Sequence, residues 1–191
     1  MSSGRGGFVT LANALTSLSL VAGVLALVSV ANSHLMKATV LIVFAVVCDS
    51  LDGAVARHRG GDGAFGANLD CLADLLSFGI VPAMALYWGP LSVHPVLGVV
   101  VCIGFVLTGA WRLARFPLVK RPDVFVGLPL PAAGVPLMIM LLFSPGLGVT
   151  AVVTVTVSIL MVSTIPFPTV ATIFGTFARV RRGDPGRRVG L

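Results

Sequence analysis

Long apolar runs, separated by short polar or charged stretches, fill this chain almost from end to end. Each run approaches the roughly 20 residues that a helix needs to cross a hydrocarbon core about 30 Å thick. The alternating segments of a membrane β-barrel are absent from the sequence, so we expect an all-α fold. The six runs predict six transmembrane helices, at about 8–30, 35–56, 66–88, 95–116, 127–143 and 148–177.

Composition supports a membrane protein. Of the 191 residues, 57% are hydrophobic and only 10% are charged, and the mean hydropathy is +1.03. Such a chain has too little polar surface to coat a soluble globule. We therefore predict one integral membrane domain of six helices, followed by a basic tail at 178–191. The prolines of "IPFP", at Ile165 to Pro168, should kink the sixth helix.

The positive charges fall almost entirely on one side of this topology, and only Lys37 lies on the other. By the positive-inside rule, both termini and the loop between the second and third helices face the cytoplasm, as expected for a cell-membrane protein. The net charge of +6 sits beside the membrane, which favours contact with anionic lipids over nucleic acid. The cytoplasmic basic residues are Arg5, Arg57, Arg59, Arg112, Arg115, Lys120, Arg121, Arg179, Arg181, Arg182, Arg187 and Arg188.

The stretch "CDSLDGAVARHRGGDGAFGANLDCLAD" contains five of the seven acidic residues. Asp49 and Asp52 are three apart at the end of the second predicted helix, and Asp70 and Asp74 are four apart at the start of the third, so each pair shares a helical face. The glycine-rich connector "HRGGDGAF" should turn the chain back and bring the two faces together. Acids at membrane depth are candidates for function.

Four converging carboxylates would repel one another unless divalent cations compensated, and oxygen ligands without His or Cys indicate Mg²⁺ or Mn²⁺. Gly53 and Gly66 would let a ligand approach the helix backbone, and the planar guanidinium of Arg57 suits a phosphate oxygen. A small ion or proton transporter is the alternative from another class, although all four acids lie at one membrane face. A non-catalytic lipid-binding scaffold is a third hypothesis.

The spacing Asp49-x2-Asp52-Gly53-x2-Ala56-Arg57-x8-Gly66-x3-Asp70-x3-Asp74 resembles the signature of the CDP-alcohol phosphotransferases. The resemblance implies a six-helix membrane enzyme, usually a homodimer, that moves a phosphatidyl group from a CDP-linked lipid to an alcohol and releases CMP. It also implies that the four aspartates hold two divalent ions and that Asp74 is the base for the acceptor hydroxyl.

The same resemblance places the nucleotide and its diphosphate against the other signature residues, Gly53, Ala56, Arg57 and Gly66. Asn13, in "TLANALTSLSL", is similar to the Asn of the family's Pro-Asn-x-Leu-Thr opening, with Ala12 in place of the Pro. We expect Asn13 to contact the cytidine.

The acceptor must be inferred from other segments. Three of them resemble blocks of bacterial and archaeal phosphatidylserine synthases: "GAWRLARF" (Gly109 to Phe116), "FVGLPLPAAG" (Phe125 to Gly134) and "LMVSTIPFP" (Leu160 to Pro168). The resemblance implies CDP-diacylglycerol as donor and L-serine as acceptor, with Arg112 and Arg115 binding the serine carboxylate. Pro117 stands where the family commonly has Asn, which leaves inositol phosphate or glycerol 3-phosphate as alternative acceptors. An archaeal-type lipid is the alternative donor.

Overall fold

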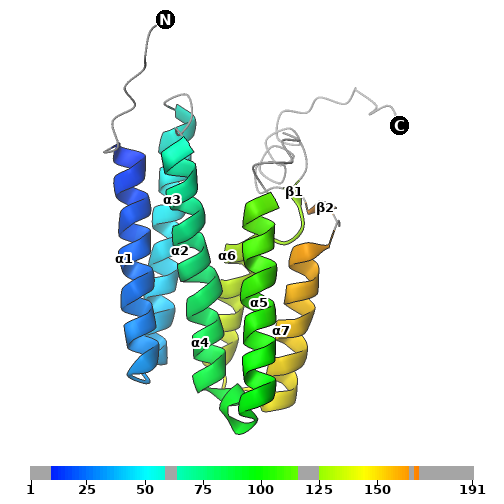
Figure 1. Ribbon diagram of the computed structural model, residues 1–191. Coiled ribbons are helices and arrows are strands. Elements are labelled where there is room, and N and C mark those ends of the chain that lie inside the picture. Colours follow the sequence, from blue (N-terminus) through cyan, green and yellow to red (C-terminus); the bar gives the residue numbers. More distant parts are fainter. Residues whose placement is uncertain (1–9, 59–63, 116–124, 164–165, 168–191) are drawn as a thin grey trace, which may run out of the picture.

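Helices dominate the computed structural model, which describes residues 10–58, 64–115, 125–163 and 166–167 (Figure 1). The predicted all-α class is confirmed, with one two-stranded addition. The strands β1 (Phe125–Val126) and β2 (Pro166–Phe167) form an antiparallel pair. The helical elements are α1 (Leu11–Ala31), α2 (Leu35–His58), α3 (Ala64–Asp74), η1 (Leu75–Ile80), α4 (Val81–Trp88), η2 (Pro90–Val93), α5 (Pro95–Arg115), α6 (Leu130–Leu141) and α7 (Leu147–Val162).

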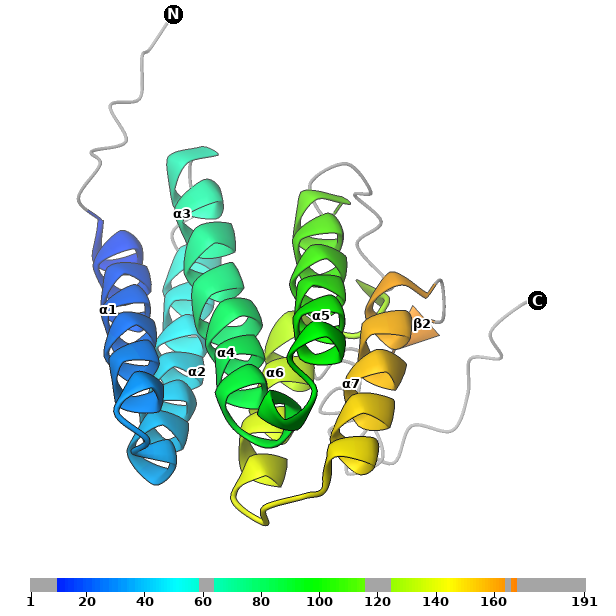
Figure 2. The ribbon, with the colours of Figure 1, turned by 60° about the horizontal axis from the view of Figure 1, so that its bottom comes forward.

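The helices stand side by side as a single bundle. Figure 2 shows α1 and α2 on one side, α5 and α7 on the other, and the rod made by α3, η1 and α4 between them. Four segments are long and apolar enough to cross a membrane: Leu11–Ala31, Leu35–Val55, Ala64–Trp88 and Pro95–Arg115. These segments match the first four predicted spans within a few residues. Since α6 and α7 are shorter, the six-span topology stays a prediction.

The length predicted for the sixth helix is wrong. Instead of running through 148–177 with a kink, α7 ends at Val162, and Ser163 has an extended ψ of 153°. Pro166 lies in β2. Proline lacks the N–H that a helix needs and disfavours the helical conformation in the residue before it, which explains why the helix stops ahead of Pro166. Pro168 and the rest of the predicted span lie outside the described residues.

A π-helical turn, η1, interrupts the third predicted span directly after Asp74. The N–H of Val81 donates to the carbonyl of Leu76, five residues earlier. Pro82 has no N–H to give to the carbonyl of Phe78, so the α-helical pattern is already broken here. The backbone of Phe78 also packs directly on α6, where a Cβ added to Gly134 would lie 2.3 Å from the Phe78 oxygen. The π-helical turn therefore fixes how α3, which carries Asp70 and Asp74, is rotated relative to the buried segment that follows it.

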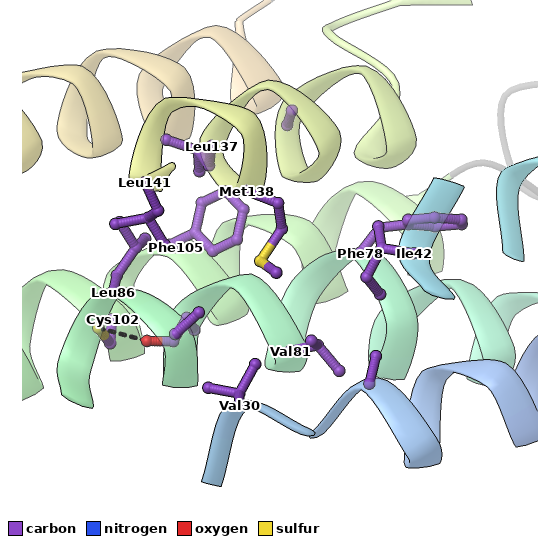
Figure 3. Close-up of a cluster of buried hydrophobic side chains, with 14 of the residues drawn as sticks. Val30, Ile42, Phe78, Val81, Leu86, Cys102, Phe105, Leu137, Met138 and Leu141 are labelled. Carbon is purple, nitrogen blue, oxygen red and sulfur yellow. Dashed lines mark hydrogen bonds between the residues drawn. The ribbon is translucent and has the colours of Figure 1, made fainter. Parts of the chain in front are cut away.

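The core between the helices is apolar and closely packed (Figure 3). Phe78, Phe105 and Met138 are fully buried and come from η1, α5 and α6. The Cys102 thiol donates to the carbonyl oxygen of Ala83 at 3.1 Å, which joins α5 to α4. This packing holds the two halves of the bundle together and so fixes the end of the bundle at which α2 finishes, α3 begins and α5 finishes.

Candidate active site

Three carboxylates meet between the second half of α2 and the last turns of α3. Oxygen atoms of Asp49, Asp70 and Asp74 all lie within 4.8 Å of one another, and each side chain is half-buried. We call these three residues the acidic cluster. Asp70 and Asp74 are one turn apart on α3, so both face Asp49 on the neighbouring helix. The convergence expected from the spacing is therefore seen for three of the four aspartates.

The acidic cluster has the chemistry of a site for a hard divalent cation. Its ligand atoms are all carboxylate oxygens, which Mg²⁺ and Mn²⁺ prefer, and they come from two helices held in fixed register. Three carboxylates this close repel one another strongly in a partly buried setting, and a cation would relieve that repulsion. The residues present thus fit a divalent metal ion.

Asp52 is not a member of the acidic cluster, in contrast to the expected convergence of all four acids. Its side chain is only 4% exposed and accepts a hydrogen bond from the hydroxyl of Thr16 on α1, with 2.5 Å between Oγ1 and Oδ2. Asp52 is three residues beyond Asp49 on α2, so it remains on the same side of that helix. Sequence reasoning missed Thr16, although it lies only one turn after Asn13 in "TLANALT".

The two arginines at the end of α5 differ in their surroundings. Arg112 is half-buried and close enough to Asp74 to interact with it electrostatically, whereas Arg115 is exposed. Among the described residues, the buried Nε of Arg112 has no hydrogen-bond partner. An unsatisfied buried donor on a cation is costly unless a ligand completes it. Arg112 is therefore placed to hold an anionic group beside the acidic cluster, whereas the role predicted for Arg115 stays a prediction.

The remaining predicted site residues are only partly described. Asn13 is buried in the first turn of α1, where its N–H donates to the hydroxyl of Thr10 at 3.1 Å. Gly53 is half-buried near the end of α2, and Gly66 is buried near the start of α3. The side chains of Ala56 and Arg57 lie outside the described part of the chain, as does Pro117, so their predicted roles stay predictions.

Backbone contacts join the two segments that follow α5 and α7. Besides the pairing of β1 with β2, the N–H of Leu128 donates to the carbonyl of Leu160 at 3.2 Å. Gly127 has a φ of +84°, and a Cβ there would lie 2.4 Å from the Met161 oxygen, so only glycine fits this position. We call this arrangement the strand clamp. It brings together the "FVGLPLPAAG" and "LMVSTIPFP" blocks, which lie far apart in the sequence.

Comparisons with known proteins identify a family and several relatives of this chain. Residues 9–175 match the model of a family described as CDP-alcohol phosphatidyltransferase. The chain is 34% identical over 160 residues to a CDP-diacylglycerol–serine O-phosphatidyltransferase of Methanocaldococcus jannaschii, covering 84% of this chain and 74% of that one. It is 35% identical to an archaetidylserine synthase of Methanothermobacter thermautotrophicus, covering 85% and 71%. A CDP-diacylglycerol–serine O-phosphatidyltransferase of Bacillus subtilis is 33% identical, with 78% and 84% covered.

Proposed function

Because the chain belongs to the CDP-alcohol phosphatidyltransferase family, we propose that it transfers the phosphatidyl group of CDP-diacylglycerol to the hydroxyl of L-serine. The products are phosphatidylserine and CMP. The names of three relatives, each aligned over more than three-quarters of this chain, support serine as the acceptor. Membership in a transferase family also decides against the transporter hypothesis.

One structural observation carries the proposal: the acidic cluster lies beside the half-buried Arg112, whose buried Nε has no hydrogen-bond partner among the described residues. The cluster suits the charged diphosphate of the donor when divalent cations are present. Arg112 suits the carboxylate of a serine whose hydroxyl must reach the same place. Guanidinium and carboxylate pair through two parallel hydrogen bonds, which orients the amino acid as well as binding it.

In the proposed reaction, Asp74 accepts the proton of the serine hydroxyl, since its carboxylate is the acid of the cluster that interacts with Arg112. The serine oxygen then attacks the phosphorus of the phosphatidyl group. A new P–O ester bond forms while the phosphoanhydride bond to CMP breaks, and CMP leaves with the bonding electron pair. A hydroxyl is a weak nucleophile at neutral pH, so a positioned base contributes about 10²- to 10⁴-fold to the rate.

The aspartates would hold the divalent ions, with Asp49, Asp70 and Asp74 as a group and Asp52 adjoining them on α2. Bound Mg²⁺ or Mn²⁺ supplies positive charge that neutralises the diphosphate and stabilises the departing CMP. We assign Gly53, Gly66, Ala56 and Arg57 to the diphosphate and nucleotide, and Asn13 to the cytidine, in keeping with the signature.

The proposal includes placement and assembly. In Figure 1, α2 ends, α3 begins and α5 ends at the same end of the bundle, and the acidic cluster and Arg112 lie toward that end. Lys37 lies in the first turn of α2, which starts at the opposite end. With the positive-inside rule, this favours a cytoplasmic active site and cytoplasmic termini in a multi-pass membrane protein. The homodimer that the family resemblance implies is part of the same proposal.

A second candidate keeps the acceptor and changes the donor. The relative from Methanothermobacter thermautotrophicus is named archaetidylserine synthase, which favours an archaeal-type lipid on the CDP. The acidic cluster would serve either donor, because both carry the same diphosphate.

Release of CMP from purified protein tests the proposal. With Mn²⁺ and CDP-diacylglycerol, serine should support turnover, whereas inositol phosphate and glycerol 3-phosphate should not. Replacing the diacyl donor by its archaeal ether counterpart separates the two candidates. Turnover with another alcohol and none with serine would contradict the acceptor assignment, and no CMP release with any acceptor would contradict the activity itself.

A further inference from the structure

The buried side chain of Asp52 is held from a different helix. Thr16 on α1 and Asp52 on α2 are each 4% exposed, and they are 36 positions apart in the chain. The two helices pack along each other, which brings the Thr16 hydroxyl to 2.5 Å from Asp52 Oδ2. A carboxylate buried to this degree needs such hydrogen bonds to compensate for lost water.

The Thr16 hydroxyl has one hydrogen and two acceptors within reach. Its Oγ1 is 2.5 Å from Asp52 Oδ2 and 3.1 Å from the carbonyl oxygen of Ala12, one turn earlier in α1. The shorter distance lies in the range of hydrogen bonds from a hydroxyl to a carboxylate, which are roughly twice as strong as neutral ones. Thr16 therefore donates to Asp52, and only weakly to the carbonyl that a helical threonine ordinarily uses.

The hydrogen bond from Thr16 to Asp52 also affects the acidic cluster. Asp52 lies on the same side of α2 as Asp49, which is one of the three members of the acidic cluster. Anchoring Oδ2 to α1 fixes the rotation of the Asp52 carboxylate, so its orientation toward the neighbouring acids is set by the packing of α1 on α2. Carboxylates that bind metals are commonly oriented by hydrogen bonds of this kind.

We propose that Thr16 is a positioning residue, whose hydroxyl holds the Asp52 carboxylate in the orientation in which it serves the divalent-metal and diphosphate site. The inference rests on the proposed function, because it requires Asp52 to contribute to metal binding. It adds a role for α1 that is distinct from the nucleotide contact assigned to Asn13. The threonine would act through Asp52 and touch neither the metal nor the substrate.

Mn²⁺ binding to the full chain in detergent, followed by the electron paramagnetic resonance signal of free Mn²⁺, tests this without relying on turnover. Thr16→Val keeps the branched shape and removes the hydroxyl, and it should weaken Mn²⁺ binding roughly 10- to 100-fold. Thr16→Ser keeps the hydroxyl and should bind within about threefold of the wild type. Thr39→Val is the matched control. Thr39 is buried like Thr16 but lies in α2, and its hydroxyl donates to the carbonyl of Leu35 at 2.9 Å.

Asp52→Asn separates the inference from the proposed function. If Asp52→Asn weakens Mn²⁺ binding while Thr16→Val does not, the positioning role is overturned and the metal role of Asp52 stands. If Asp52→Asn binds Mn²⁺ as tightly as the wild type, the metal role of Asp52 and the positioning role of Thr16 are both overturned. An equal loss in Thr39→Val would indicate a general packing effect and would also overturn the inference.

A double variant completes the test. In the Asp52→Asn background, Thr16→Val should cause no further loss of Mn²⁺ binding, because the group it positions is already changed. An additive loss would overturn the inference. Should Thr16→Val fail to fold, Thr16→Cys replaces it. The thiol is a weak donor of similar size, so Thr16→Cys should also bind Mn²⁺ more weakly than Thr16→Ser, and equal binding would overturn the inference.

Discussion

Two neighbouring regions at the same end of the bundle are built by different means. The first is formed by α1, α2 and α3, and the second by α5, β1 and β2. In the first, side chains at helical spacing meet across neighbouring helices, as Asp49, Asp70 and Asp74 do. In the second, backbone atoms of distant segments make the contacts, through the strand clamp and Gly127. Arg112 connects the two regions, because it lies in the last turn of α5 and interacts with Asp74.

This difference separates two tasks in the proposed reaction. A diphosphate with its metal ions needs several charges at fixed distances, and rigid helices supply them. An acceptor that varies within a family needs a region that can change without disturbing those charges, and connecting segments outside the helices allow that. We therefore expect substitutions in the first region to abolish turnover or weaken donor binding. Substitutions in the second region should change the KM for the acceptor or the thermal stability.

The largest effect should come from Asp74→Asn. The amide keeps the shape of the side chain but cannot accept the acceptor's proton, so turnover should fall by at least about 10³-fold. Because Asp49 and Asp70 of the acidic cluster remain to hold divalent ions, binding of CDP-diacylglycerol, measured by calorimetry in the presence of Mn²⁺, should fall far less than turnover does, by no more than about tenfold. Asp52→Asn should instead weaken the binding of metal and donor. An equal loss of donor binding in both variants would contradict the separate roles of these two aspartates.

Arg112→Gln should have the next largest effect and should fall on the acceptor. Removing the cation that pairs with a buried carboxylate costs about 2–3 kcal/mol, which corresponds to a roughly 30- to 150-fold increase in the KM for serine. Arg115→Gln is the matched control on the same helical turn, and because Arg115 is exposed, its KM should change less than about threefold. Steady-state kinetics with serine varied at saturating CDP-diacylglycerol would measure both.

The reverse order, with Arg115→Gln more damaging than Arg112→Gln, would show that the acceptor site lies farther from the acidic cluster. Donor binding should be unchanged in both variants. A loss of donor binding in Arg112→Gln would instead assign this arginine to the diphosphate and so weaken the comparison between the two regions.

Gly127→Ala should destabilise the strand clamp. The position has a φ of +84°, and the new Cβ would meet the Met161 oxygen at 2.4 Å, so the cost should be about 1–3 kcal/mol. For a chain of this size, the thermal midpoint in detergent should fall by several degrees, or at least about 3 °C. Gly104→Ala in α5 is the control, because a Cβ there meets nothing within 4 Å and should leave the midpoint unchanged or slightly higher.

The two regions also differ in how far the sequence could predict them. Aspartate spacing on two apolar helices joined by a glycine-rich connector was enough to predict that carboxylates converge, because helical geometry repeats along the chain. The departure of Asp52 was not predictable, since it depends on how α1 packs on α2 and on the partner that Thr16 offers. A pattern within one segment contains no information about such a partner.

The second region was predicted less well for a related reason. The prolines after α7 were expected to kink a longer helix, but Pro166 lies in a strand paired with residues about 40 positions earlier. The π-helical turn η1 was also missed, although Pro82 and Gly134 are both visible in the sequence. Backbone pairing between distant segments, and a glycine that packs on a carbonyl of another helix, leave no periodic signal.

The smallest effect should come from Cys71→Ala, which sharpens the account of the acidic cluster. Cys71 is half-buried on α3 and interacts electrostatically with Asp70, Asp74 and Arg112, so its thiol lies beside the cluster without being a member. Hard ions such as Mg²⁺ and Mn²⁺ prefer carboxylate oxygens to sulfur, so the Mn²⁺ concentration that gives half-maximal CMP release should change by less than about twofold. Cys102→Ala, in the core and away from the cluster, controls for the loss of a thiol elsewhere.

A shift of about tenfold or more in Cys71→Ala alone would mean that the sulfur takes part in metal binding. The first region would then owe its metal preference to a neighbour of the aspartates as well as to their oxygens.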